Sequence, residues 1–113
     1  MTSTIQIGDR EIAMTANAAT CYRYKQVFKK DLFQIFKTAE QMDITAIQEL
    51  AYVMMHQASG TVDKMNFDDY MTWLETFDAL DFAHASAQIV NVYANQQKTT
   101  AAAKKKVNEQ TGQ

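Results

Sequence analysis

The chain contains no proline, a single cysteine and only three glycines among its 113 residues. The absence of proline removes the strongest helix breaker and favours an α-rich fold. One cysteine, Cys21, excludes an intrachain disulfide and makes a reducing, intracellular setting the default. The glycines Gly8, Gly60 and Gly112 lie too far apart in the sequence to form a phosphate-binding loop.

Long apolar runs and a strong net charge are also missing. No segment approaches the roughly 18 apolar residues of a membrane span. The start of the chain lacks the basic and apolar regions of a signal peptide. A formal net charge of -2 and a pI near 5.6 provide no overall basic field for nucleic acid. We therefore expect a soluble, cytosolic protein whose partners include no nucleic acid and no membrane.

What the chain does contain is an ordinary globular composition, with 47% hydrophobic and 21% charged residues. Its length suits one domain with one core. We assign residues 1–97 to a single helical domain with an N-terminal hairpin. Residues 98–113 are rich in Lys, Ala and Gln, and Val107 is their one sizeable apolar residue. Burial cannot offset the entropy of ordering this segment, so we expect a flexible tail.

Apolar bulk and charge are concentrated between Cys21 and Phe36. Spacings of three and four place an apolar stripe on one face, which predicts the central helix of a small helical domain. The stripe comprises Cys21, Tyr24, Phe28, Leu32, Ile35 and Ala39.

Polar residues mark the ends of this segment. Asn17 is the favoured N-cap, with Thr15 as the competing choice. Asp31 followed by Gln34 resembles a capping box, which predicts two helices meeting near residue 30. One continuous helix to about Glu40 remains the alternative, because Lys and Asp are both tolerated inside helices.

Ahead of this segment, polar and apolar residues alternate over about 4–15, with a turn signal at Gly8 and Asp9. The pattern predicts a short β-hairpin whose apolar face must pack on the helices or on another subunit, because a lone hairpin is marginal in water. The predicted face consists of Ile5, Ile7, Ile12 and Met14.

Three further helices are predicted after residue 42. Asp43 caps a helix over 44–58 that Ser59 and Gly60 terminate, Asn66 caps a helix over 67–77, and a last helix covers about 81–96. The predicted fold is therefore mainly α: a small domain of about four helices with a short N-terminal β-hairpin and a flexible C-terminal tail.

Residues that carry catalysis or bind metals are scarce and scattered. His56 and His84 have no Cys or His neighbour at ligand spacing. The acidic group around 63–69 lacks the glycine and terminal glutamate of an EF-hand, and helix capping explains it better. Cys21 has no orienting group that would make it a nucleophile. We assign no catalytic, metal-binding or cofactor-binding residue and conclude that the protein is not an enzyme.

Methionine and aromatic residues are, by contrast, abundant. The seven methionines either fill gaps in the core or form an adaptable binding surface. The aromatic set of Tyr70, Trp73, Phe77 and Phe82 is open to the same two interpretations. The lysines at 104–106 are interpreted as solvated charge rather than as a nucleic-acid contact.

Three motifs, taken in order, carry a family resemblance. The first is Tyr22-Arg23-Tyr24 with Phe28 and Asp31, the second is Leu50 to Met54 with Gln57-Ala58, and the third is Trp73-Leu74 with Phe77. Together they resemble the tail assembly chaperones of long-tailed bacteriophages and prophages, a family encoded just upstream of the tape measure protein. The resemblance covers roughly residues 4–106. The chain departs from the pattern at Lys30, where a glycine is common, and at Tyr93, where a tryptophan is common.

The resemblance implies a non-catalytic function in the host bacterial cytoplasm. Such chaperones bind the tape measure protein, keep it soluble, assist the tail tube protein to polymerise around it, and are absent from the mature virion. Many also have a longer frameshifted form. On this basis Tyr52, Met55, Tyr70 and Trp73 are hypothesised to contact the partner, and self-association remains open.

Two other functions compete with this one. A structural tail-completion or connector subunit would stay in the virion and pair its hairpin between subunits. A small helical adaptor for nucleic acid would need a basic surface, which the net charge of -2 disfavours.

Overall fold

The computed structural model describes residues 2–37 and 43–95. The chain is mainly helical, with an N-terminal two-stranded antiparallel hairpin, which confirms the predicted fold class. The elements are β1 (Ser3–Ile7), β2 (Arg10–Met14), α1 (Thr20–Phe28), α2 (Leu32–Lys37), α3 (Ile44–Ser59), the 3₁₀ helix η2 (Val62–Lys64), α4 (Phe67–Leu74) and a last helix described over 81–95. The predicted tail over 98–113 lies outside the described residues.

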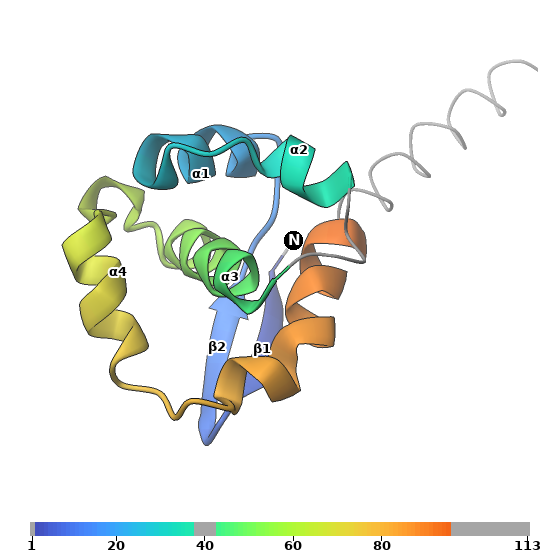
Figure 1. The fold of residues 1–113 in the computed structure, drawn as a ribbon, viewed down its shortest axis with the longest axis vertical. Coiled ribbons are helices and arrows are strands. Elements are labelled where there is room, and N and C mark those ends of the chain that lie inside the picture. Colours follow the sequence, from blue (N-terminus) through green and yellow to red (C-terminus); the bar gives the residue numbers. More distant parts are fainter. Residues whose placement is uncertain (1, 38–42, 96–113) are drawn as a thin grey trace, which may run out of the picture.

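Helix α3 is the central element (Figure 1). Helices α1 and α2 lie on one side of it and the hairpin on the other, while α4 and the 81–95 helix flank it. The predicted caps are confirmed: the Asp43 side chain accepts a hydrogen bond from the Ala46 amide at 2.9 Å, and Gly60 ends the helix at φ 70°. Every residue from Glu49 to Met54 is buried. The expectation that the segment after Cys21 forms the central helix is therefore wrong, because α3 is covered on nearly all sides.

The segment after Cys21 forms two helices, which is one of the two alternatives that the sequence left open. Lys29 adopts the left-handed conformation at φ 59°, and its amide donates to the Lys25 carbonyl, so α1 ends there. The break turns the chain while keeping Phe28 and Leu32 buried on either side of it. Ala39 and Glu40, to which the continuous alternative extended, lie outside the described residues.

Asn17 is not the N-cap of α1, which is Ala19. The Asn17 side chain instead accepts a hydrogen bond from the Ala19 amide at 2.9 Å, and its carbonyl accepts one from the Thr20 amide at 3.1 Å. Asn17 thus shapes a turn that precedes the helix, a role that short polar side chains perform as readily as capping.

The hairpin packs its apolar face on the helices, which is one of the two arrangements predicted; the other was packing on another subunit. Its register pairs Ser3 with Met14 and Ile5 with Ile12, and Ile5, Ile7 and Met14 are buried. The Thr15 amide donates to the Met54 carbonyl of α3 at 3.1 Å, which joins the end of β2 to the central helix.

A candidate interaction surface

Two of the residues proposed as partner contacts lie in the core instead. Tyr52 is 0% exposed and Tyr70 is 2% exposed, so neither forms part of the surface. Their rings meet edge to face at 5.2 Å between centroids. Met55 and Trp73, the other two, are half-buried and pack against the core. The surface hypothesis is wrong for Tyr52 and Tyr70, because both side chains fill the space between α3 and α4.

A chain of aromatic contacts explains this burial. The Phe28 ring lies 4.8 Å from that of Tyr70, and the Trp73 ring lies 5.7 Å from Tyr52 and 5.6 Å from Phe82. These contacts connect α1, α4, α3 and the 81–95 helix through the interior. For Tyr70, Trp73, Phe77 and Phe82, core packing is therefore the main role, with Trp73 and Phe77 only partly covered.

The residues that carry the family resemblance occupy mixed positions. Phe28 is buried, whereas Tyr22 is 66% exposed on the outer side of α1. Arg23 donates to the Gln57 side chain of α3 at 3.2 Å, so these two motif residues bind each other. Asp31 lies in the break between α1 and α2. Leu74 is half-buried against the core, as Trp73 and Phe77 are.

One charged group is buried in the interior. Glu49 of α3 is 4% exposed. It accepts a hydrogen bond from the Tyr24 hydroxyl and forms an ion pair with Lys30, whose Nζ lies 3.0 Å from Oε2. Burial, together with the hydrogen bond to Glu49, raises the pKa of Tyr24 above its ordinary value of 10.0. A buried carboxylate needs such partners, so this cluster holds α1 and the α1–α2 break against α3.

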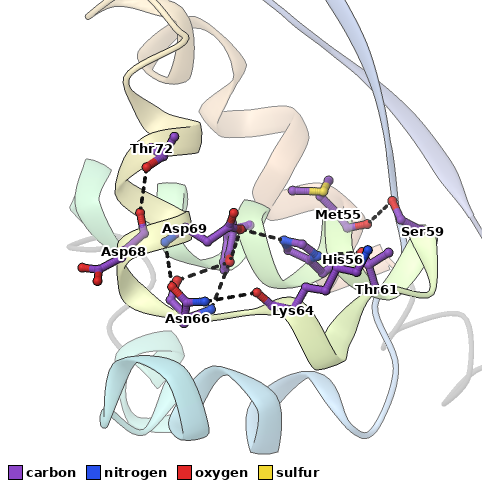
Figure 2. A network of polar contacts seen from close by, with 10 residues as sticks. Met55, His56, Ser59, Thr61, Lys64, Asn66, Asp68, Asp69 and Thr72 are labelled. Carbon is purple, nitrogen blue, oxygen red and sulfur yellow. Dashed lines mark hydrogen bonds and ion pairs between the residues drawn. The ribbon is translucent and has the colours of Figure 1, made fainter.

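A second polar network joins α3 to η2 and α4 (Figure 2). The Tyr52 hydroxyl donates to Asp69 at 2.7 Å, and His56 Nδ1 lies 2.7 Å from the Thr61 hydroxyl. His56 Nε2 lies 3.5 Å from the same Asp69 carboxylate, an ion-pair distance when the imidazole is protonated. Asn66 caps α4 by accepting from the Asp69 amide at 2.7 Å. The network positions the start of α4 on α3.

The outer sides of α1 and α4 each carry exposed apolar side chains among polar and charged ones, and nothing in the described chain covers them. Phe67 is 55% exposed and Met71 41% exposed, one helical turn apart on α4. A groove of about 440 Å³, which we call the α1–α4 groove, lies between the C-terminal end of α1 on one side and residues 62–66 with the first residue of α4 on the other. Its lining includes Val27 of α1, Lys29 at the C-cap of α1, three residues of the connector that we define as residues 61–66 (Val62, Asp63 and Met65), and Phe67 of α4.

A second, smaller hollow adjoins this groove. It has a volume of about 380 Å³, and Tyr22, Lys25, Gln26 and Lys29 line it at steps of three and four along α1. Gln26 and Lys29 line both hollows, so the two form one continuous surface. Exposed aromatic and methionine side chains beside a groove are typical of protein interaction sites.

Three further features of the described residues concern metal binding, membrane insertion and the cysteine. Across residues 2–37 and 43–95, no group of three His, Cys, Asp or Glu side chains could hold a metal ion. No helix within those ranges is long and apolar enough to cross a membrane. Cys21 Sγ lies 3.0 Å from the Tyr93 hydroxyl and packs against the core. We take the α1–α4 groove, together with the adjoining hollow, as the candidate functional site among the described residues.

Comparisons with known proteins add no assignment: no family model matches the chain, and neither the curated proteins nor the solved structures gave a significant match. The family expectation rests on the three motifs alone.

Sequence reasoning missed the importance of Phe67 and Met71. A signal for them was present, because Phe67, Tyr70, Met71, Trp73 and Leu74 surround more of α4 than one buried stripe can cover. Glu49 was also missed, since a glutamate within a helix is usually solvent-facing.

Proposed function

We propose that this protein is a non-catalytic phage tail assembly chaperone that binds an apolar segment of the tape measure protein in the α1–α4 groove. The observation that carries the proposal is the exposed Phe67 side chain in the lining of that groove, with the exposed Met71 one helical turn further along α4. The motif resemblance supplies the identity of the client. A chaperone requires adaptable apolar contacts rather than a deep catalytic pocket, and Phe and Met side chains provide them.

The residues proposed to contact the client differ from those expected from the sequence. Tyr52 and Tyr70 would act by holding α4 in place, whereas Phe67, Met71 and Tyr22 would touch the client. Trp73 and Met55 are only half-covered and lie against the core, so we assign them a supporting role.

Co-expression with the tape measure protein encoded downstream tests the proposal. We expect the chaperone to raise the soluble fraction of the tape measure protein and to co-purify with it. The double variant Phe67→Ser, Met71→Ser should lose both effects. Leu80→Ser is the control, because Leu80 is also apolar and 64% exposed but belongs neither to α4 nor to the lining of the groove. Solubilisation that survives the double variant would contradict the assignment of the groove.

Mass spectrometry of finished particles separates this function from a structural role. A chaperone leaves before the tail is complete, so we expect no peptides of this chain in purified virions. Their presence at stoichiometric amounts would favour a tail-completion or connector subunit instead.

A further inference from the structure

The charge around the α1–α4 groove is uneven. Lys29, the C-cap of α1, lines both the groove and the adjoining hollow, whereas Lys25 of α1 lines the hollow alone, and both residues are exposed. Asp63 lies in the lining on the opposite, connector side. The lining of the groove thus holds one lysine and one carboxylate, and Lys25 in the adjoining hollow adds a second positive charge on the α1 side; we call Lys25 and Lys29 together the basic wall.

The two lysines of this wall have no ion-pair partner in the described part of the chain, whereas the neighbouring cations are engaged. Lys30 binds the buried Glu49 at 3.0 Å, and Arg23 donates to Gln57 at 3.2 Å. Lys25 and Lys29 are thus available to a partner, and their aliphatic stems extend the apolar surface beside Tyr22.

We infer that the groove accepts an amphipathic α-helix that carries acidic residues along the edge of its apolar stripe facing α1. This inference rests on the proposed function, because it describes the client segment that the chaperone would bind. The apolar stripe would cover Phe67, Met65 and Val27, and the acidic edge would meet Lys25 and Lys29. Apolar contacts supply most of the affinity in such helix-in-groove complexes, and charge selects the partner.

Other occupants fit these features less well. Nucleic acid would place phosphates beside Asp63, and two lysines give only a weak electrostatic contribution. An anionic membrane surface generally requires a larger cluster of basic residues than this wall provides.

Two synthetic peptides of roughly 18 residues, about five helical turns, test the inference by calorimetry. Both carry the same leucine stripe, and one has glutamates along its edge where the other has lysines. We expect the glutamate peptide to bind roughly tenfold more tightly at low salt, as two exposed ion pairs would produce. The preference should shrink as salt is raised.

Matched variants test whether Lys25 and Lys29 cause the preference for the glutamate peptide. In Lys25→Gln, Lys29→Gln, the preference for the glutamate peptide should disappear while some affinity remains. The control Ala83→Glu, Gln88→Glu lowers the net charge by the same two units on the exposed side of the 81–95 helix, and it should keep most of the preference.

The outcomes distinguish this inference from the proposed function. Equal binding of both peptides, abolished by Phe67→Ser, would overturn the charge inference and leave the groove as a binding site. Binding of neither peptide by a chain that still solubilises the tape measure protein would also overturn the inference. Binding of neither peptide without solubilisation would overturn both.

Discussion

The two sides of α1 and α4 differ in what they contribute. Facing inward, Phe28 and Tyr70 lie in an aromatic chain that fills the space beside α3. Facing outward, Tyr22 and Phe67 are each more than half exposed although they are equally large and apolar. Residue type alone does not separate these two sets. Only the fold distinguishes the aromatic residues that stabilise the domain from those available to a partner.

The sharpest test of this contrast compares two aromatic residues on α1. Phe28→Ala removes a ring that is 8% exposed and should lower the free energy of unfolding by about 3–5 kcal/mol. Tyr22→Ala on the outer side should change it by no more than about 0.5 kcal/mol. Urea denaturation followed by circular dichroism measures both, and similar losses would show that the two sides are not distinct.

A smaller effect is expected where the buried carboxylate is hydrogen bonded. Tyr24→Phe removes the hydrogen bond to Glu49 and should cost about 1.5–3 kcal/mol, the range for bonds to charged groups. The pKa of Tyr24 is raised in the folded state, so the stability associated with its neutral form is present below pH 10.0 and is lost as pH rises beyond it. The free energy of unfolding should therefore decrease less between pH 8 and pH 11 in Tyr24→Phe than in the wild type.

Tyr70 should respond in the opposite direction. Its hydroxyl is buried with no hydrogen-bond partner among the described residues, and burial raises its pKa as it does for Tyr24. Removing an unsatisfied hydroxyl while keeping the ring should leave stability unchanged or raise it by up to about 1 kcal/mol. A clear loss of thermal stability in Tyr70→Phe would indicate that the hydroxyl has a partner after all.

The smallest effects on folding belong to the outer side of α4. Phe67→Ser and Met71→Ser should each alter stability by less than about 0.5 kcal/mol, because both side chains are exposed. Differential scanning calorimetry on each variant checks this value. A larger loss would mean that these residues act in folding, which would weaken any interpretation of binding defects.

Local sequence signals predicted the elements with clear end markers. Asp43, Gly60 and Asn66 occupy the capping positions expected of them. The alternation of polar and apolar residues over 4–15 correctly predicted the hairpin. These features depend on a few neighbouring residues, so they can be inferred from the sequence alone.

The features that were not predicted depend on contacts between distant segments. Lys29 adopts a left-handed conformation that a glycine would normally mark, and no local pattern indicates it. The burial of Tyr52 and Glu49 follows from α1 and α4 covering α3, which the apolar stripe of α3 does not reveal. The candidate site was missed for the same reason, because exposure is set by what packs beside a helix.

Photo-crosslinking in the complex tests the central claim most directly. A photoreactive p-benzoylphenylalanine is placed at position 67, in the lining of the groove, or at position 80, an exposed position outside that lining. Each protein is co-expressed with the tape measure protein and irradiated. The account predicts a crosslink to the tape measure protein from position 67 and little or none from position 80. A crosslink from position 80 alone would show that the client binds elsewhere and would contradict the assignment of the α1–α4 groove.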